Sequence, residues 1–247
     1  MAVRAVLFDL GDTLWHFPEL PPTQTIREET MRRLYALLRS WDVEPEGELR
    51  FLGRDIRLAL GEADRLAYEG DCVSPHYPAL TREVAASKGL DLTPERAEEL
   101  WDTWNLGGIF LGRQLFPDAI DMLSALRDAG YRLGAVTNRS FGGPRFLSEV
   151  RELGLTPFFE TVAISCDMGY MKPHARIYEH ALEAMALDPG ETVMVGDSLR
   201  ADVAGSQALG MTAVWRKPLK MREEQDGIRP DFVVDELREI PDLACFA

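Results

Sequence analysis

The sequence predicts an α/β fold, a doubly wound parallel sheet into which a helical segment is inserted. After residue 118, helical and strand patterns alternate four times, which is typical of a parallel sheet with right-handed crossovers. One short apolar strand precedes this series at residues 4–8. Between the two parts, residues 18–105 carry apolar side chains at helical spacing. We therefore expect the first strand and the later strands to form one sheet.

The length and composition fit a globular protein with one core domain and a smaller insert. The chain has 247 residues, of which 46% are apolar and 28% are charged. It has no apolar run of about 18 residues, the length that a membrane span requires. The N-terminus also lacks the pattern of a signal peptide. We expect a cytoplasmic location and no membrane partner.

The net charge of −14 argues against nucleic acid as a partner, because no basic stripe offsets the repulsion of a polyanion. A small anion is not excluded, since one metal ion and one lysine in a pocket outweigh screened surface carboxylates. Cys72, Cys166 and Cys245 match no metal-binding or redox spacing. We expect them to be reduced, mostly buried thiols without disulfides.

The stretch VLFDLGDTL, residues 6–14, is the one around which the fold is expected to be organised. Its first three residues are apolar and predict the end of a strand buried on both faces. Asp9 then lies beyond the carboxyl end of that strand, where α/β sheets bind their ligands. An Asx turn after a strand would also explain Asp9, so the other motifs must decide between the two interpretations.

The next segment predicts an inserted helical domain. The sequence PELPP at residues 18–22 cannot continue a central strand. Thr93 and Pro94 supply an N-cap and a first helical residue for the last helix of the insert. Trp101 and Trp104 lie three positions apart on that helix, and we interpret them as packing residues. The helical patterns cover residues 23–41, 49–66, 80–89 and 94–104.

The remainder of the chain predicts the other elements of the sheet. Residues 107–117 contain three glycines and a proline, a composition typical of a flexible return crossing. Because the insert leaves and re-enters beside Asp9, we expect it to lie over this residue as a lid. A short edge strand at residues 231–234 and a closing helix end the chain. Helices are expected at residues 118–129, 144–153, 175–187 and 201–209, and strands at 132–136, 161–164, 192–195 and 212–215.

Polar side chains follow three of the later strands, where each apolar run stops. Each of them has an ordinary structural explanation, as a helix cap or a surface lysine. Structural roles alone explain less easily why all of these residues occur at the carboxyl ends of strands of one sheet. These residues are Thr137, Asn138, Lys172, Asp197, Ser198 and Asp202.

Together, these motifs resemble those of the haloacid dehalogenase-like (HAD) hydrolase superfamily, in its capped phosphatase branch. FDLGDTL with Asp9, AVTN with Thr137, MKP with Lys172 and VGDSLRAD with Asp197 occur in the family's order and spacing. The resemblance covers nearly the whole chain and implies a HAD-like α/β core with a helical cap between the first and second motifs. The implied domains are the core at residues 1–17 and 112–247 and the cap at residues 18–111.

The resemblance implies that Asp9 is a nucleophile that forms an aspartyl phosphate. Attack by a carboxylate on phosphorus splits a difficult hydrolysis into two easier steps, but it requires two anions to meet. A Mg²⁺ ion held by Asp9, the backbone carbonyl of Gly11 and Asp197 would neutralise their repulsion. Lys172 and Thr137 would bind the phosphoryl oxygens as charge develops.

Further residues complete the site that the resemblance implies. The backbone N–H groups of Leu10, Gly11 and Asn138 are expected to bind phosphoryl oxygens. Asp202 and Ser198 are expected to contact the ligands of the metal ion, or the lysine, and so to orient them. The predicted site thus draws on four separate segments of the chain.

One position departs from the family pattern. Most phosphatases of this family carry a second aspartate two residues after the nucleophile, as general acid and base. Gly11 occupies that place here, and Asp12 follows one position later. General acid catalysis contributes about 10²- to 10⁴-fold in rate, so without a substitute only substrates with good leaving groups would react quickly. The geometry of the turn decides whether Asp12 can act as the acid.

Gly11 leaves two other functions open. Family dehalogenases also lack the second aspartate, which favours 2-haloacid cleavage by Asp9. They differ from this chain at the fourth motif, where the metal carboxylate Asp197 is kept. A reaction at uncharged carbon has no need of that carboxylate, so metal-dependent phosphate chemistry is preferred. The other alternative is a non-catalytic protein that binds phosphoryl ligands.

The expected substrate is a small phosphorylated metabolite, because the chain is similar to phosphoglycolate phosphatases and other capped enzymes. Residues of the insert that face the pocket would set specificity, with His16, Arg54, Tyr68 and His76 as candidates. Each of these is better explained as an ordinary surface or packing residue than as a specificity contact. The sequence leaves the oligomeric state open, a monomer included.

Overall fold

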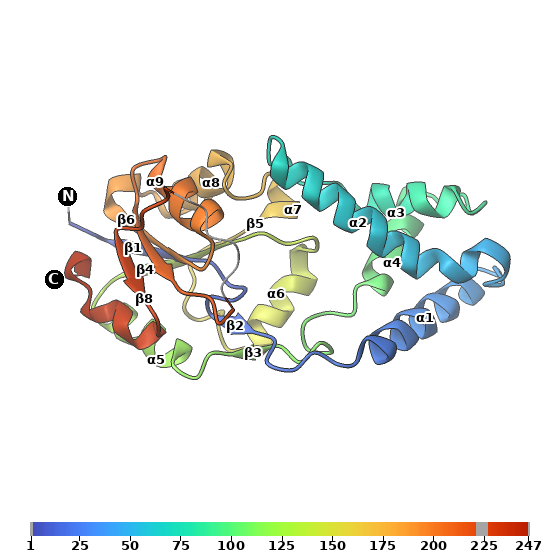
Figure 1. Ribbon diagram of the computed structural model, residues 1–247, viewed down its shortest axis with the longest axis horizontal. Coiled ribbons are helices and arrows are strands. Elements are labelled where there is room, and N and C mark those ends of the chain that lie inside the picture. The colour runs from blue at the N-terminus through green and yellow to red at the C-terminus, as the bar shows by residue number, and fades with distance from the viewer. Residues whose placement is uncertain (1, 221–226, 247) are drawn as a thin grey trace. The chain divides into compact units, whose positions relative to one another are not determined.

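The computed structural model describes residues 2–220 and 227–246. The chain divides into two compact units, residues 1–16 with 113–247 and residues 17–112. The first unit holds a parallel sheet and the second is helical, as Figure 1 shows. Each unit buries large apolar side chains of its own, so each has its own core.

The first unit is built on a six-stranded sheet. Its strands are Ala5–Phe8 (β1), Arg132–Thr137 (β4), Val162–Ile164 (β5), Thr192–Gly196 (β6), Thr212–Arg216 (β7) and Phe232–Val234 (β8). Their order is β5-β4-β1-β6-β7-β8, and all neighbours are parallel. The predictions that β1 lies inside the sheet and that β8 lies at its edge are confirmed.

The order of the strands reverses on either side of β1. The chain continues from β1 to β4 and β5 on one side, and then returns to β6, β7 and β8 on the other. Phe8, the last residue of β1, is in register with Ala135 of β4 and Val195 of β6. Asp9 therefore follows β1 at the switch point, where the carboxyl ends of neighbouring strands leave a crevice.

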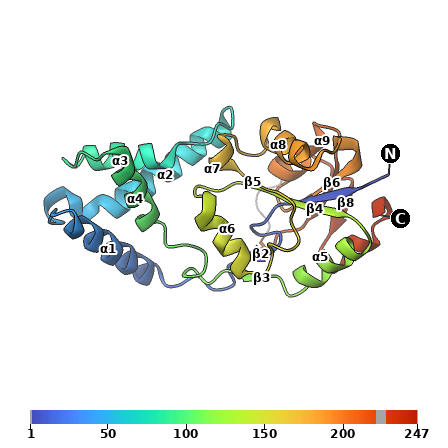
Figure 2. The same ribbon diagram turned by 180° about the vertical axis from the view of Figure 1, so that it is seen from behind.

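Helices cover both faces of the sheet. Helices α5 (Ala119–Asp128) and α6 (Gly143–Glu152) pack with Val6 on one face. Helix α8 (Ala175–Met185) packs with Leu7 on the other. Figures 1 and 2 show α5 and α8 on opposite sides of the sheet in both views. A strand covered on both faces reads as a continuous apolar run, which is the pattern that β1 shows.

The second unit is built from helices, as predicted. Its elements are α1 (Thr23–Ser40), a 3₁₀ helix at Gly47–Phe51, α2 (Leu52–Glu69), α3 (Tyr77–Ala86) and α4 (Pro94–Trp104). Thr93 caps α4, its hydroxyl accepting from the N–H of Arg96 at 3.3 Å. Trp101 stacks on both Trp104 and Tyr77 with ring centroids 5.4 Å apart, so the tryptophans pack between helices. No helix in the described part of the chain combines the length and the apolar character of a membrane span.

A two-stranded antiparallel ribbon belongs to the first unit and was not predicted. Strand β2 (Trp15–His16) pairs with β3 (Gln114–Leu115). In the sequence, the two strands stand just before and just after the helical unit. A strand of two residues shows no periodicity, so no pattern indicated it. The segment predicted as a flexible return crossing therefore ends in an ordered ribbon.

Two helix predictions near the C-terminus differ from the structure. The predicted closing helix is instead a pair of 3₁₀ segments, Leu237–Asp242 and Ala244–Phe246. Pro241 lacks the N–H that a continuous α-helix would need at that point. The helix predicted at residues 201–209 begins as a π-helical segment, Leu199–Ala204, and continues as the short α9 (Gly205–Gln207).

The prediction for the cysteines is correct in part. All three are free thiols. Only Cys72 is buried, whereas Cys166 and Cys245 are partly exposed, so the expectation of mostly buried thiols was wrong. Burial raises the pKa of Cys166 to about 12, which leaves it as an unreactive thiol at neutral pH.

Candidate active site

Asp9 lies directly after β1 and is 7% exposed. Its backbone N–H donates to the carbonyl of Val195 at 2.9 Å, which extends the pairing of β1 with β6 by one residue. Its carboxylate oxygen Oδ1 accepts a hydrogen bond from Nζ of Lys172 at 2.6 Å. Both the backbone and the side chain of Asp9 are therefore fixed in orientation.

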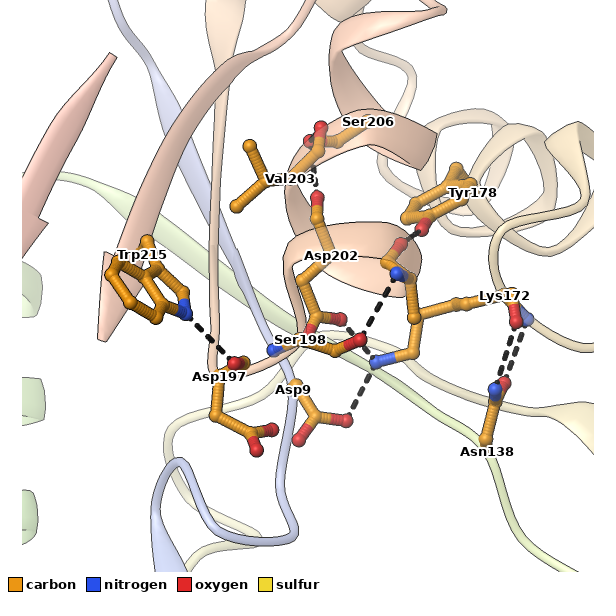
Figure 3. Close-up of polar contacts among 11 residues, drawn as sticks. Asp9, Asn138, Lys172, Tyr178, Asp197, Ser198, Asp202, Val203, Ser206 and Trp215 are labelled. Carbon is orange, nitrogen blue, oxygen red and sulfur yellow. Dashed lines mark hydrogen bonds and ion pairs between the residues drawn. The ribbon is translucent and has the colours of Figure 1, made fainter. Parts of the chain in front are cut away.

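Lys172 connects Asp9 to Asp202. Its Nζ also donates to Oδ1 of Asp202, at 2.7 Å. Lys172 and Asp202 are almost inaccessible to solvent. Figure 3 shows the ammonium group between the two carboxylates. Buried charges are tolerated when they are paired, and here one cation faces two anions, so this part of the site attracts further positive charge.

Burial and neighbouring charges act together on this pair. Burial works to lower the pKa of Lys172, but the charges of Asp202 and Asp9 outweigh it and raise the pKa above its ordinary value. Burial raises the pKa of Asp202 to about 6, with a further increase from Asp9 and an opposing effect of Lys172. Lys172 is therefore a cation throughout the neutral range.

Asp197 brings a third carboxylate to the cluster. It directly follows β6, and its backbone carbonyl accepts from the indole N–H of Trp215 at 2.8 Å. Asp9, Asp197 and Asp202 each offer a carboxylate oxygen, and these oxygens lie within 4.8 Å of one another (Figure 3). Hard divalent cations prefer oxygen ligands of this kind. The residues present therefore fit a divalent metal ion.

The turn after β6 is shaped around the carboxylate of Asp202. A Cβ atom at Gly196 would lie 2.2 Å from Cγ of Asp202, so a larger residue does not fit there. The N–H of Ser198 donates to Oδ2 of Asp202 at 2.9 Å. The hydroxyl of Ser198 accepts from the N–H of Ala201 at 3.1 Å. Asp202 is thus held through both oxygens, one by Ser198 and the other by Lys172.

Asn138 fixes the segment that carries Lys172. Its side-chain amide donates to the carbonyl of Lys172 at 3.0 Å and accepts from the N–H of Lys172 at 2.7 Å, as Figure 3 shows. Thr137, the last residue of β4, is buried. Because β4 and β1 are neighbours in the sheet, Thr137 ends its strand beside Asp9. The side chain of Asn138 therefore positions Lys172, a contact that the sequence did not indicate.

The turn after β1 contains the other predicted site residues. Leu10 is buried, and its carbonyl accepts from the N–H of Trp15 at 3.0 Å. Gly11 forms a β-bridge with Trp15. Asp12 adopts a left-handed backbone with φ of 56°, and its carbonyl accepts from Arg216 at 3.0 Å. The turn is therefore held by contacts at three successive residues.

The residues predicted to set specificity have structural contacts of their own. His16 stacks on a phenylalanine ring at 4.3 Å between centroids. In the helical unit, Nδ1 of His76 accepts the backbone N–H three residues later and caps α3. Arg54 pairs at 2.6 Å with the aspartate that follows it, and Tyr68 lies on α2. Their role in specificity stays a prediction.

Two arginines near the turn were not among the predicted site residues. Arg113 pairs with Glu149, and its Cζ lies 4.6 Å from the ring centroid of Trp15. The Cζ of Arg139 lies 5.3 Å from the centroid of the same ring. Arg113 falls in the predicted return crossing, where no pattern marks it. Arg139 directly follows Asn138, and that position after a motif was the sequence signal that could have identified it.

Comparisons with known proteins identify a family and relatives that span the chain. A family model described as haloacid dehalogenase-like hydrolase matches residues 3–210. The chain is 29% identical to a glyceraldehyde 3-phosphate phosphatase of Methanopyrus kandleri, over 98% of this chain and 97% of that protein. It is 30% identical to a phosphoserine phosphatase of Thermus thermophilus, over 96% of this chain and 98% of that protein.

The similar solved structures include a phosphatase and a dehalogenase, the two kinds of enzyme that the sequence left open. The crystal structure of a 2-haloacid dehalogenase from Pseudomonas syringae pv. Tomato DC3000 is 26% identical, with a TM-score of 0.63 and 97% of each chain covered. The family model nevertheless covers most of the chain, and a phosphatase relative 30% identical spans nearly all of it. The chain belongs to the haloacid dehalogenase-like hydrolases.

Proposed function

We propose that this protein is a Mg²⁺-dependent phosphatase that hydrolyses a small phosphorylated metabolite through an aspartyl phosphate on Asp9. The cluster in which Lys172 lies between Asp9 and Asp202, with Asp197 as a third carboxylate, carries the proposal. Phosphoryl transfer from an anionic ester needs a nucleophile, a fixed cation and a site for a metal ion. Two full-length relatives named as phosphatases support the same reaction.

The proposed ligands of Mg²⁺ are Asp9, Asp197 and the backbone carbonyl of Gly11. Bound there, the ion would supply neutralising charge between the carboxylates and the phosphoryl group. Asp202 already binds Ser198 and Lys172 through its two oxygens. We therefore assign Asp202 to orienting the lysine and the metal site.

The proposed reaction has two steps. A carboxylate oxygen of Asp9 bonds to phosphorus while the bond from phosphorus to the ester oxygen breaks, and the departing oxygen takes up a proton. Water then attacks the phosphorus of the aspartyl phosphate, which releases inorganic phosphate and restores the carboxylate. The groups proposed to bind the phosphoryl oxygens are Lys172, Thr137 and the backbone N–H groups of Leu10, Gly11 and Asn138.

Phosphate release tests this function. Purified protein is assayed with p-nitrophenyl phosphate and with a panel of sugar phosphates and phosphorylated acids, in Mg²⁺ and in EDTA. We expect turnover that requires Mg²⁺ and that Asp9→Asn abolishes. Asp128→Asn, which removes an exposed carboxylate of α5, serves as the matched control and should leave the rate unchanged. Absence of phosphate release from every ester would overturn the proposal.

A 2-haloacid dehalogenase is the second candidate, because Gly11 lacks the acid of most family phosphatases and a dehalogenase is among the similar solved structures. In that reaction Asp9 would displace halide from carbon. The three clustered carboxylates argue against it, since a haloacid anion gains nothing from a metal site and is repelled by negative charge. Chloride release from 2-chloropropionate without added metal would support this candidate, and its absence would remove it.

A further inference from the structure

Arg139 is held rigidly at the carboxyl end of β4, two residues after Thr137. Its backbone N–H donates to the hydroxyl of Ser165 at 2.8 Å, and its carbonyl accepts from the same hydroxyl at 3.0 Å. Ser165 is fully buried. The base of the Arg139 side chain is therefore fixed to the neighbouring strand end, independently of the contacts around Lys172.

Two aromatic rings fix the other end of this side chain. The Cζ of Arg139 lies 5.3 Å from the ring centroid of Trp15 and 5.4 Å from that of Phe146. Contacts of a guanidinium group with aromatic faces at this distance are attractive and restrict its rotation. The guanidinium group is consequently presented in one orientation, as a binding group requires.

This guanidinium group lies next to the turn that follows the nucleophile. A Cβ atom at Gly11 would lie 3.7 Å from Nε1 of Trp15, the ring over which Arg139 lies. Gly11 is two residues from Asp9, and β4 is the neighbour of β1 in the sheet. Arg139 therefore lies on the Gly11 side of the catalytic cluster, beside the ring of Trp15.

The charges of Asp9, Glu149 and Asp12 act on Arg139 without a direct ion pair, and the charge of Arg113 opposes them. Within residues 2–220 and 227–246, no carboxylate forms an ion pair with Arg139, and its Nε is shielded from solvent without an acceptor. Arg113, the other arginine at Trp15, is neutralised by Glu149. Burial lowers the pKa of Arg139 to about 10, so the side chain remains protonated at neutral pH. An oriented guanidinium group without a counterion, close to a nucleophile, has the properties of an anion-binding group.

Taking the phosphatase activity proposed above as given, we propose that Arg139 is a specificity residue that binds a second anionic group of the substrate. The substrates so favoured are small phosphomonoesters that also carry a carboxylate or a second phosphate. A guanidinium group meets both anions in a bidentate geometry, and the aromatic contacts have already removed much of its rotational freedom. A substrate with an uncharged body would leave Arg139 without a counterion in the complex.

A matched pair of substrates tests this proposal. 3-Phosphoglycerate and glyceraldehyde 3-phosphate differ by a carboxylate in place of an aldehyde. We expect kcat/KM of the wild-type protein to favour 3-phosphoglycerate by about 10- to 100-fold, the usual effect of one charge-assisted hydrogen-bonded pair. Arg139→Gln should remove this preference while leaving kcat/KM for glyceraldehyde 3-phosphate within about twofold, and Arg139→Lys should keep part of it.

The controls separate specificity from folding. Arg151→Gln removes an exposed arginine from α6 and should change neither rate. Unchanged turnover of glyceraldehyde 3-phosphate by Arg139→Gln shows that the variant is folded and catalytically intact. An equal loss on both substrates would make Arg139 a structural residue. No preference in the wild-type protein, or one that survives Arg139→Gln, would equally refute the proposal.

Binding measurements distinguish failure of this inference from failure of the proposed function. Calorimetry with the Asp9→Asn variant in Mg²⁺ gives Kd for the same two compounds without turnover. We expect tighter binding of 3-phosphoglycerate by about 10-fold or more, lost when Arg139→Gln is added. If the wild-type protein releases phosphate from no ester but this difference in Kd is found, the function fails and the anion site stands. If the two compounds bind equally or not at all, the anion site is refuted whatever the turnover.

Discussion

Lys172 is the most constrained side chain of the candidate site. It is 2% exposed, its Nζ contacts Asp9 at 2.6 Å and Asp202 at 2.7 Å, and Asn138 holds its backbone. The lysine offsets the repulsion between two carboxylates that would otherwise face each other in a buried place. In the proposed reaction it would also be the group that meets the phosphoryl oxygens. Its structural and catalytic contributions can be separated, because stability and rate are measured independently.

Lys172→Met tests both contributions. The variant leaves Asp9 and Asp202 without their shared cation, so we expect the free energy of unfolding to fall by about 3–5 kcal/mol at pH 7. Loss of a charge-stabilising donor should lower kcat by about 10²- to 10³-fold or more. Urea denaturation and single-substrate kinetics measure the two effects. A rate within tenfold of the wild-type value, in a folded variant, would contradict the role of Lys172 in binding the phosphoryl group.

Gly11→Asp restores the residue that most family phosphatases have at this position. A Cβ atom there meets only Nε1 of Trp15, at the ordinary contact distance of 3.7 Å, so the turn has room for a Cβ atom. We expect the rate for esters with poor leaving groups, such as phenyl phosphate, to rise by about 10²-fold or more, because a general acid is supplied. Gly11→Ala controls for the loss of glycine. If phenyl phosphate turnover is unchanged or lower, Asp12 already acts as the acid.

At the scale of elements, a buried ion pair joins α6 to the residue before β3. Arg113 is 7% exposed and Glu149 is 8% exposed. Glu149→Gln removes the negative charge and leaves the arginine buried, and we expect the free energy of unfolding to fall by about 3 kcal/mol. The double variant Arg113→Met with Glu149→Gln should recover most of this loss. Urea denaturation measures the free energy of unfolding of both variants. A loss below about 1 kcal/mol in the single variant would contradict the stabilising role of the ion pair.

A hydrogen bond between Asp64 of α2 and Tyr77 of α3 joins these two helices, and burial shifts the pKa of the Asp64 carboxyl. Burial raises the pKa of Asp64, and the hydroxyl of Tyr77, which donates to Oδ1 at 2.7 Å, only partly opposes this. The folded state therefore binds a proton more readily than the unfolded state does. Stability is lost as pH rises from the unfolded pKa of about 4 through the raised folded pKa.

Asp64→Asn removes this loss and keeps an oxygen that accepts from Tyr77. We expect the variant to be more stable than the wild-type protein at pH 7, by less than about 1 kcal/mol because solvent screens a half-buried group. The gain should disappear below about pH 4, where the aspartate is protonated in both states. Thermal melts of both proteins from pH 3 to pH 8 test the sign. A gain that does not depend on pH would refute the electrostatic explanation.

Some residues of the site and some elements of the fold could be predicted from the sequence, and others could not. Asp9 and Asp197 were found because each follows an apolar run, and parallel strands bring such positions to one edge. Lys172 lies eight residues beyond β5 and was found through the MKP motif. Arg139 was missed although it directly follows Asn138, because no sequence pattern shows whether an arginine side chain forms an ion pair. The π-helical segment was missed as well, since no residue pattern marks it. The hydroxyl of Ser206, just after this segment, donates to the carbonyl of Asp202 at 2.5 Å.

At the scale of the whole molecule, the three-carboxylate cluster should make stability depend on divalent metal. A ligand that binds only the folded state at about 100 times its Kd adds about 2.7 kcal/mol to the free energy of unfolding. We expect Mg²⁺ to raise the melting temperature by several degrees, and Asp197→Asn to remove most of that rise. Because the net charge is −14, NaCl at equal ionic strength must serve as the control for screening. An equal rise with NaCl alone would contradict a specific metal site.

The family could be predicted from the motifs, and the α/β fold from the alternation of helices and strands. The role of the helical unit as a lid stays a prediction. Motifs are local in sequence, and each strand of the six-stranded sheet lies within one residue of its predicted bounds. The relation of one compact unit to another depends on two connecting segments, which carry no comparable pattern. The residues predicted to set substrate choice likewise belong to no single motif. The experiments on Arg139 address the part of that choice that lies within the α/β unit.

The ribbon of β2 and β3 brings together His16 and Gln114, the points between which the helical unit is spliced into the chain. Two antiparallel strands in register need only a tight turn to connect them, so a short Asn-Gly loop could replace all of residues 17–112. The α/β unit would then be one uninterrupted polypeptide. The helical unit would be a segment that can be exchanged for another. Grafting the corresponding segment of another enzyme onto this ribbon would leave the residues of the α/β unit in place and would test the prediction that the helical unit sets which esters are accepted.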